Sequence, residues 1–502
     1  MDTPMGQPAM AAPQEVRVNF TTTSPDLQLP EDRSSLLVVP TDLKRYGLSR
    51  ILNSSSMLDT PSPVPFDFLI NGEYLRTSLQ EYLVARGLNA EETLAIQYVR
   101  SLIPPAYQAS FEHDDWVSDV DVLSATSRAG LWSGGKLGLN QDRVLSAAYD
   151  GVLRIWDPSG RCVARSSAAG GHAASAKAAR FLSSTQIASA GLDRTVRIWK
   201  YAESEGGLQG ALKPSLELYG HTASVDALDV HGPTGRVLSA SADGAVGLWT
   251  TSKSAAPAAP ANLLPGAGAS ESKRRKLSGA SAAPQRGPLS LMAVHSSAAT
   301  AACFDPADAT VAYSASHDHS IRTIDLTTGK VENAITTSHP LLALAPLRRN
   351  PGTASSSVLL AAATAARHVT LVDPRVSAST TSVLTLRGHR NMVSSLAAGP
   401  DNDHSLVSAS FDGTCRIWDL RSVRAGTKAE GGGSVSESVY VVERESLLRG
   451  GGAGRPPRRA GDVPGRGAKV FGVAWDKTFG IVSAGEDKMV QINRGQDLLA
   501  AT

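Results

Sequence analysis

The chain has 502 residues, of which 42% are hydrophobic and 19% charged, and its 49 basic and 47 acidic side chains give a formal net charge of +2. This composition excludes an intrinsically disordered chain and leaves little excess positive charge for coating nucleic acid. Three widely separated cysteines, Cys162, Cys303 and Cys415, exclude a disulfide framework and a cysteine-rich zinc site. Because no stretch resembles a secretory signal or is long enough to span a bilayer, we expect neither secretion nor membrane insertion.

The first hundred residues differ in texture from the rest. We expect residues 1–14 to be disordered and residues 15–103 to form a separate small domain. Apolar residues that alternate or run together predict its strands, at 16–20, 36–39, 66–70 and 94–99.

Two helices are expected between these strands. One is predicted at 42–52, with Asp42 as its N-cap, and the other at 78–86, ended by Gly87. The order ββαβαβ in about 90 residues predicts a small α+β fold of the ubiquitin-like kind. We assign residues 104–112 to a linker.

A self-similar segment recurs from about residue 113 to residue 495. Each copy has a serine, an aspartate four residues later and, in four copies, a tryptophan six residues after the aspartate. The serine–aspartate pairs are Ser146 and Asp150, Ser189 and Asp193, Ser239 and Asp243, Ser314 and Asp318, Ser408 and Asp412, and Ser483 and Asp487. Two short strands joined by a tight turn that holds the aspartate satisfy this pattern.

A histidine precedes four of the copies, so four residue types recur at fixed offsets. Their polar groups can close a buried chain of hydrogen bonds that fixes the geometry of each repeat. The three complete sets are His172, Ser189, Asp193 and Trp199; His221, Ser239, Asp243 and Trp249; and His389, Ser408, Asp412 and Trp418. The pattern resembles the WD-repeat β-propeller, and this resemblance implies an all-β ring of seven blades over 113–495.

Two segments interrupt the repeat spacing, at about 252–288 and 421–467. Both are rich in Gly, Ala, Ser or Pro, and we predict flexible insertions. The first contains the basic cluster Lys273, Arg274, Arg275 and Lys276, a candidate nuclear import signal that is equally well explained as a solvated loop.

Two motifs resemble catalytic or metal sites, but neither fits its residue pattern. Gly130–Leu137 has the spacing of a phosphate-binding loop, but Leu137 stands where a hydroxyl should bind Mg²⁺. His317, Asp318 and His319 are better explained as a turn between strands than as metal ligands. We therefore predict a protein that is not an enzyme and has no cofactor or metal of its own.

Four segments carry a closer resemblance: Leu43–Ser49, Pro63–Leu69, Gly72–Leu79 and Asp115–Asp121. Together with the order of domains, they resemble the WD-repeat subunit of the pescadillo and block-of-proliferation complex. That family consists of assembly factors of the large (60S) ribosomal subunit. The resemblance implies a location in the nucleolus and nucleoplasm and a role in processing pre-rRNA to the 25S/28S and 5.8S rRNAs.

The resemblance also implies partners. In this family the propeller binds the block-of-proliferation subunit, itself a propeller, in a trimer with pescadillo. The N-terminal domain is engaged by midasin, an AAA ATPase whose metal-ion-dependent adhesion site takes an acidic side chain as a ligand. ATP-driven pulling by midasin then removes the complex from the pre-60S particle.

The acidic ligand in this family follows a Gly-Leu-x-x-Glu stretch, which here is Gly87–Glu91. A carboxylate oxygen on an exposed loop suits a hard cation such as Mg²⁺. We therefore assign the ligand to Glu91, with the adjacent Glu92 as the runner-up. From the residues alone, both are ordinary loop carboxylates.

An alternative reading remains, in which the chain is a substrate adaptor or scaffold for a ubiquitin ligase. The small domain runs through Arg100–Pro105 without the C-terminal Gly-Gly of ubiquitin, which favours the assembly factor. The sequence also leaves open whether the basic second insertion contacts RNA directly.

Overall fold

The computed structural model describes residues 14–495 with gaps at 31–34, 61, 90, 135–136, 139–140, 168–169, 205–206, 208, 266–282, 348–357, 376–382, 401, 431 and 450–464. Residues 1–13 of the start predicted to be disordered, the basic cluster at 273–276, and Gly135 and Lys136 of the phosphate-loop-like string lie outside these residues. Two compact units result: residues 1–103 together with 421–425, and 104–420 together with 426–502.

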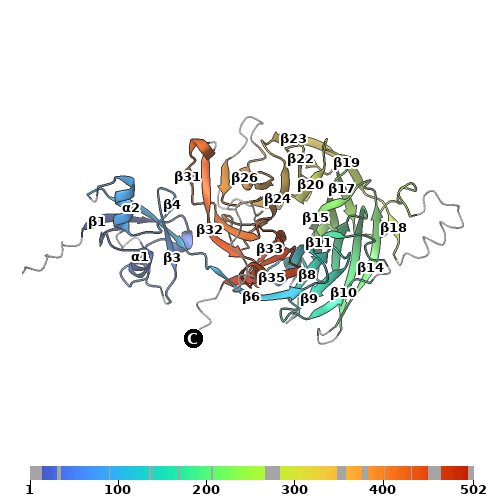
Figure 1. Ribbon diagram of the computed structural model, residues 1–502, viewed down its shortest axis with the longest axis horizontal. Coiled ribbons are helices and arrows are strands. Elements are labelled where there is room, and N and C mark those ends of the chain that lie inside the picture. Colours follow the sequence, from blue (N-terminus) through green and yellow to red (C-terminus); the bar gives the residue numbers. More distant parts are fainter. Residues whose placement is uncertain are drawn as a thin grey trace, which may run out of the picture. The chain divides into compact units, whose positions relative to one another are not determined.

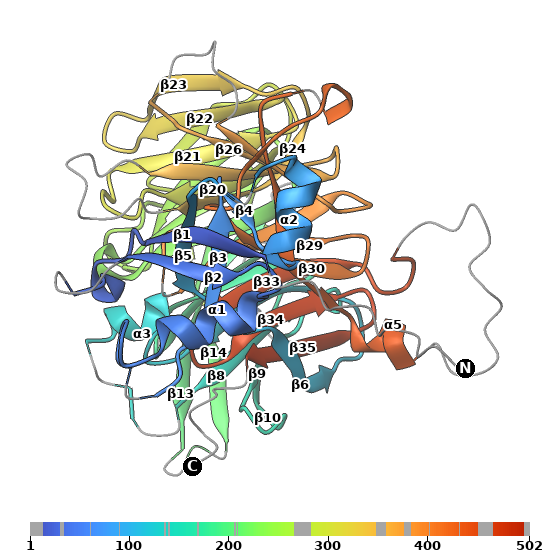
Figure 2. The same cartoon turned by 90° about the vertical axis from the view of Figure 1, so that its left-hand side faces the viewer.

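The first unit contains a five-stranded sheet of order β2-β1-β5-β3-β4, in which β1 and β5 are parallel. Its strands are β1 (Glu15–Thr21), β2 (Leu36–Pro40), β3 (Phe66–Ile70), β4 (Glu73–Tyr74) and β5 (Leu94–Arg100), and a short helix η1 covers Pro25–Leu27. Figure 2 shows β1, β2 and β5 side by side. The short strand β4 was not predicted; it follows the tight turn at Asn71 and Gly72, both of positive φ, which pairs it with β3.

Two helices bury apolar side chains against one core with this sheet. Helix α1 (Arg45–Leu52) contributes Leu48 and Leu52, and α2 (Leu79–Arg86) contributes Leu79 and Leu83. The prediction that Asp42 caps the first helix is wrong, because the N-cap is Lys44 and makes no side-chain hydrogen bond. Helix α2 starts instead with a reciprocal capping box between Ser78 and Glu81.

The second unit consists of blades of four antiparallel strands, which follow one another around a ring in chain order (Figure 1). The first three blades are β7 (Val117–Leu123), β8 (Arg143–Ala148), β9 (Leu153–Trp156) and β10 (Cys162–Arg165); β11 (Ala176–Ser183), β12 (Gln186–Gly191), β13 (Thr195–Glu203) and β14 (Gly210–Tyr219); and β15 (Val225–His231), β16 (Arg236–Ser241), β17 (Ala245–Thr250) and β19 (Ser290–Ala293). Short elements between them are α3 (Arg128–Trp132), η2 (Gly232–Thr234) and β18 (Gln285–Arg286).

Four further blades complete the ring. Blades four and five are β20 (Ala299–Phe304), β21 (Val311–Ser316), β22 (Ser320–Asp325) and β23 (Lys330–Thr336); and β24 (Leu341–Leu347), β25 (Leu359–Thr364), β26 (His368–Val372) and β27 (Leu384–Arg387). Blades six and seven are β28 (Val393–Ala398), β29 (Ser405–Ser410), β30 (Thr414–Asp419) and β32 (Ser434–Glu443); and β33 (Val470–Asp476), β34 (Gly480–Gly485), β35 (Met489–Gly495) and β6 (Pro105–Glu112). The all-β seven-bladed WD-repeat prediction is confirmed.

The ring is closed by a strand from its own beginning. Residues 105–112, predicted to be a linker, form β6 and pair antiparallel with β35 as the outer strand of the last blade. The pairing runs from Met489 opposite Glu112 to Gly495 opposite Pro105, and it buries Phe111. The linker prediction is wrong because the partner strand β35 lies almost 400 residues later in the sequence, so no local pattern indicates the pairing.

The second predicted insertion is also partly wrong. Within 421–467 lie β31 (Arg424–Ala425), η3 (Lys428–Glu430), β32 and α5 (Glu445–Arg449), and β32 is the outer strand of the sixth blade. The glycine-rich stretches on either side of β32 dominate the average composition of 421–467, so the composition of the segment predicts a flexible loop although it contains this ten-residue strand.

Candidate functional sites

Buried hydrogen-bond chains hold the turns of the complete blades. In the second blade the Trp199 indole N–H lies 2.8 Å from Ser189 Oγ, which lies 2.7 Å from His172 Nε2, and His172 Nδ1 lies 3.0 Å from Asp193 Oδ2. Because the carboxylate only accepts, His172 Nδ1 must donate to it, and the other nitrogen of the neutral ring then accepts from the Ser189 hydroxyl, whose oxygen accepts from the indole N–H. One tautomer of a neutral histidine satisfies the whole chain.

The same chain recurs in the third and sixth blades. His221 lies 2.7 Å from Ser239 and 3.2 Å from Asp243, and Trp249 donates to the same serine. His389, Ser408, Asp412 and Trp418 repeat the arrangement with distances of 2.7 to 2.9 Å.

Burial and hydrogen-bond donors together set the charge states of the aspartate and the histidine in the sixth blade. Burial by itself raises the pKa of Asp412, but hydrogen bonds from His389, Thr414 and the backbone of Arg390 outweigh it and hold this pKa well below its usual range. Burial lowers the pKa of His389, which agrees with the neutral tautomer. The serine, histidine and aspartate of these three sets therefore support the turns of their blades, and none of them is a free base or nucleophile.

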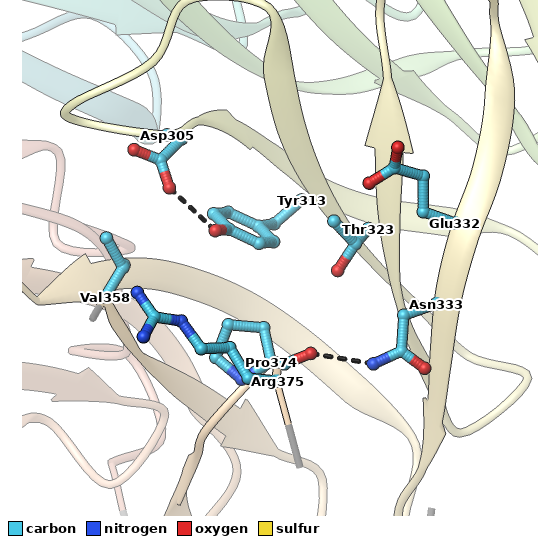
Figure 3. A pocket seen from close by; sticks show the side chains of 8 residues that line it. All are labelled: Asp305, Tyr313, Thr323, Glu332, Asn333, Val358, Pro374 and Arg375. Carbon is cyan, nitrogen blue, oxygen red and sulfur yellow. Dashed lines mark hydrogen bonds between the residues drawn. The ribbon is translucent and has the colours of Figure 1, made fainter. Parts of the chain in front are cut away.

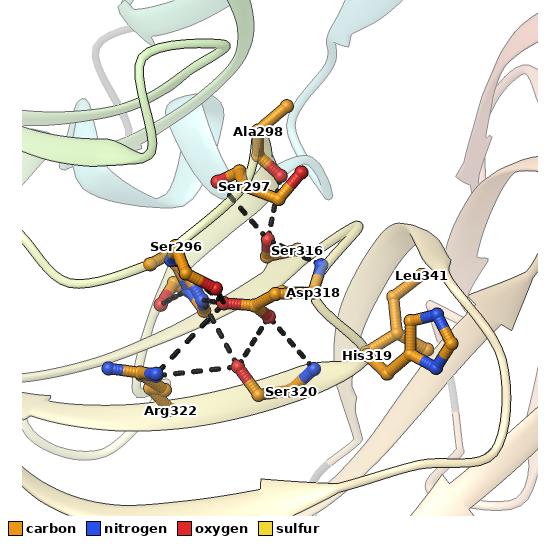
Figure 4. A network of polar contacts seen from close by, with 12 residues as sticks. Ser296, Ser297, Ala298, Ser316, Asp318, His319, Ser320, Arg322 and Leu341 are labelled. Atoms are coloured by element: carbon orange, nitrogen blue, oxygen red, sulfur yellow. Dashed lines mark hydrogen bonds and ion pairs between the residues drawn. The ribbon is translucent and has the colours of Figure 1, made fainter.

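The fourth blade explains the His317, Asp318 and His319 motif. Asp318 accepts from His295 Nδ1 at 3.0 Å. It also accepts from the Ser320 hydroxyl at 2.6 Å and from the backbone N–H groups of Ser296 and Ser320, and Arg322 lies 4.0 Å away (Figure 4). His319 has a φ of 67° in the turn. The carboxylate thus serves as the turn acceptor, as predicted.

The first blade contains a histidine that the sequence reading missed. His113 Nε2 lies 2.8 Å from Ser146 Oγ, which also accepts from Trp156 at 2.9 Å. Its Nδ1 lies 3.2 Å from the Phe111 carbonyl instead of the turn aspartate, Asp150, which bonds Arg154. Burial, aided by the Arg154 charge, lowers the pKa of His113 to about 4. His113 directly follows β6. Because β6 lies in the segment predicted to be a linker, this histidine was not recognised as part of the first repeat.

In the last blade Asn493 stands where four other blades have the repeat tryptophan, and an arginine takes the place of the histidine that bonds the serine and the aspartate. The Arg444 side chain is 1% exposed; its Nη1 donates to Ser483 Oγ at 2.8 Å and its Nε to Asp487 Oδ2 at 3.0 Å. Its Nη2 also donates to Asp487 and to the Met489 carbonyl. Arg444 comes from the preceding blade, directly after β32, so the repeat offsets gave no signal for it.

The loop between α2 and β5 holds the predicted acidic ligand. Gly87 adopts a φ of 65° and ends the helix, and the Leu88 N–H bonds the Leu83 carbonyl at 3.0 Å. Glu91 and Glu92 follow, and both side chains are exposed. Neither carboxylate forms an ion pair with any residue that the structure describes.

Several other acids of this unit are already engaged. Asp67 pairs with Arg45 at 3.0 Å, Asp26 pairs with Arg100 at 3.0 Å, and Glu73 pairs with Arg86. Glu81 belongs to the capping box. Glu91 and Glu92, by contrast, are exposed and form no ion pair with the described residues, so their carboxylates can contact an outside group.

No site on the described part of the chain indicates catalysis. These residues contain no group of three or more potential metal ligands. A cavity of about 210 Å³ in the second unit is lined by Tyr313, whose hydroxyl donates to Asp305 at 2.7 Å, and by the Asn333 amide, which donates to Pro374 (Figure 3). Burial and the Asp305 charge raise the pKa of Tyr313, so it remains a protonated donor. Among the described helices, none has the length and apolar character needed to cross a bilayer.

Comparison with known proteins gives matches over both units. A family model described as the NLE (NUC135) domain matches residues 16–83, and the WD domain, G-beta repeat model matches 165–200, 212–250 and 380–419. The chain is 60% identical to the ribosome biogenesis protein YTM1 of Chaetomium globosum, over 100% of both chains. It is 61% identical to the protein of the same name from Neurospora crassa, over 97% of this chain and 98% of that one, and 59% identical to that of Chaetomium thermophilum, over 99% of each.

Replacing Arg444 with alanine is expected to lower the free energy of unfolding by roughly 3–5 kcal/mol, because Asp487 then remains buried without its main cationic partner. The measurement is urea unfolding followed by tryptophan fluorescence. Adding Asp487→Asn to this variant is the matched control and should recover part of the loss, since the unpaired charge disappears. A stability equal to that of the wild type would show that the arginine does not support the blade.

Stability should also depend on pH through His113. Because its pKa is lowered from 6.5 to about 4 in the folded state, the unfolded chain binds the proton first as the pH falls. Its contribution is intact above about pH 6.5 and is lost between there and pH 4, by about 1.4 kcal/mol per pH unit at most. Urea unfolding of wild type and His113→Gln over this range measures the difference. A gap that stays constant with pH would contradict the prediction.

Proposed function

The chain belongs to the family of the ribosome biogenesis protein YTM1, and from that premise we propose that it is an assembly factor of the large ribosomal subunit that works by binding, without catalysis. The resemblance read from the sequence motifs is thereby confirmed, and so is the prediction that the chain is not an enzyme, since this WD-repeat family consists of scaffolds. Association with pre-60S particles in the nucleolus and nucleoplasm follows from the same role.

The propeller supplies the binding part of this function. Its ring is closed by β6, and buried hydrogen-bond chains fix the blade turns, so loops from successive blades are presented on a rigid frame. We assign the block-of-proliferation subunit to this frame as the direct partner, and pescadillo as the third member of the trimer. The processing of pre-rRNA to the 25S/28S and 5.8S rRNAs then depends on this complex.

The N-terminal unit supplies the handle for removal. The observation that carries this assignment is the loop after α2, where Glu91 and Glu92 are exposed and lack ion-pair partners among the described residues, whereas Asp26, Asp67 and Glu73 are paired. An unpaired carboxylate on a helix-to-strand loop fits a cation that keeps one position open for an outside oxygen ligand. Midasin holds such a cation in its adhesion site, and Glu91 is the ligand we assign, with Glu92 second.

Replacing Glu91 with alanine is expected to abolish binding of the full chain to the midasin adhesion domain in the presence of Mg²⁺ and to leave the fold unchanged. No carboxylate then reaches the cation, and the exposed side chain supports no core contact. Binding is measured by biolayer interferometry and folding by circular dichroism. Glu15→Ala, which removes an exposed acid from β1, is the matched control and should bind normally.

The result separates the two loop acids. If Glu91→Ala binds as wild type while Glu92→Ala does not, the runner-up residue is the ligand. If both variants and their combination bind normally, the loop is not the handle.

Affinity purification of the tagged chain from cells tests the wider role. We expect pescadillo, its propeller partner and precursors of the large subunit in stoichiometric amounts, because a rigid scaffold keeps its partners during purification. Tagged Arg444→Ala, which weakens the last blade, should recover less of the propeller partner. Recovery of cullin-type subunits in place of ribosomal precursors would favour the ubiquitin-ligase adaptor instead.

A further inference from the structure

Four aromatic side chains from three blades gather at one end of the propeller. Trp116 directly precedes β7, Tyr149 directly follows β8, Phe411 follows β29, and Phe471 is the second residue of β33. Because the first strand of each blade starts where its antiparallel neighbour ends, these four positions lie on the same face of the ring. We call Trp116, Tyr149, Phe411 and Phe471 the aromatic platform.

The rings of the aromatic platform contact one another. The ring centroids of Trp116 and Tyr149 are 5.5 Å apart, and each lies 6.0 Å from that of Phe471. Phe411 joins the cluster at 5.7 Å from Phe471. Trp116 is 39% exposed and the other three rings are half-buried, so the platform forms a continuous apolar surface open to solvent. Clustered exposed aromatics of this kind are typical of protein interaction sites.

Two lysines border the platform. The Lys177 ammonium lies 4.7 Å from the centre of the Tyr149 ring and donates to the Tyr149 hydroxyl at 2.9 Å, and Lys469 lies 5.9 Å from the centre of the Phe411 ring. Lys469 is paired with Glu486 at 3.4 Å. Lys177 forms no ion pair within the described ranges, and its ammonium has three donors, of which the phenol takes one. It is therefore a half-buried cation with donors available for an anion.

The geometry selects among ligand classes. A cationic ligand is disfavoured, because the ammonium groups of Lys177 and Lys469 lie beside the rings and would repel it. Insertion of a nucleic-acid base between two rings is disfavoured too, since Trp116 and Tyr149 meet at 71° and Phe411 and Phe471 at 90°, so neither pair forms a parallel slot. An apolar side chain accompanied by a carboxylate matches both the rings and the unpaired ammonium.

We propose that the aromatic platform and Lys177 form a docking site for a linear acidic segment of a partner protein. The segment places an aliphatic or aromatic side chain against Trp116 and Phe471 and an Asp or Glu side chain within hydrogen-bond distance of Lys177. This site goes beyond the assembly role proposed above and does not depend on it, because it follows from the exposed surface of the second unit alone.

The test is selection of a random linear peptide library displayed on phage against the purified full chain. We expect enriched peptides in which Asp or Glu lies within a few residues of Leu, Ile, Phe or Trp. Trp116→Ala should weaken a selected synthetic peptide on the order of 30-fold, as expected of a central aromatic contact, and Lys177→Gln about tenfold, as for loss of a hydrogen bond to a charged group. Isothermal titration calorimetry gives the affinities.

Two matched variants control for general effects. Leu131→Ser changes an exposed apolar residue of α3, and Lys213→Gln removes an exposed lysine from β14; both should bind the peptide as wild type. If Trp116→Ala fails to fold by circular dichroism, Lys177→Gln and Lys177→Glu carry the test, with the reversal weakening acidic peptides more strongly.

Three outcomes would overturn the proposal. The first is the absence of enriched peptides whose binding depends on Lys177. The second is enrichment of basic in place of acidic peptides. The third is binding of a fluorescein-labelled oligouridylate that is lost in Trp116→Ala and Lys177→Gln, which would assign the surface to single-stranded RNA.

Discussion

A buried carboxylate must receive donors, and this requirement governs the turns of the propeller. Leaving such a charge unsatisfied in the interior costs several kcal/mol. The buried turn aspartates receive donors from their own hairpin, as Asp412 does from Thr414, and also from a partner outside it. In three blades the partner is a histidine linked through serine to tryptophan, and in the last blade it is Arg444. The fifth blade has no aspartate at this turn; there the Thr364 hydroxyl bonds the His368 carbonyl. Histidine in some blades and arginine in another thus donate to the turn carboxylate, and the fifth blade has no such carboxylate.

Two of these side chains also link consecutive blades. Arg444 follows the outer strand of the sixth blade and bonds the turn of the seventh. His113 follows β6, the outer strand of the seventh blade, and bonds the serine of the first. Each such bond links the residue that follows the outer strand of one blade to the next blade, so the hydrogen-bond chains and the closing strand act together to hold the ring.

The two units divide the chemistry of the protein between them. The propeller keeps its charged turn residues inside hydrogen-bond chains and exposes an aromatic platform beside Lys177. The small N-terminal unit pairs several of its acids and leaves Glu91 and Glu92 exposed on one loop. Neither pattern provides a nucleophile beside a base. Both patterns suit the binding role proposed above.

The sequence by itself determined the features that local chemistry dictates. Repeating offsets of Ser189, Asp193 and Trp199 predicted blades because residues in one hairpin meet whatever the rest of the chain does. The order of strands and helices predicted the N-terminal fold, and Gly87 marked the start of the loop that holds Glu91. Only the tertiary structure decided the roles of β6, Arg444, His113 and the aromatic platform. Their partners lie tens to hundreds of residues away, and closure of the ring brings them together, so no local pattern could reveal them.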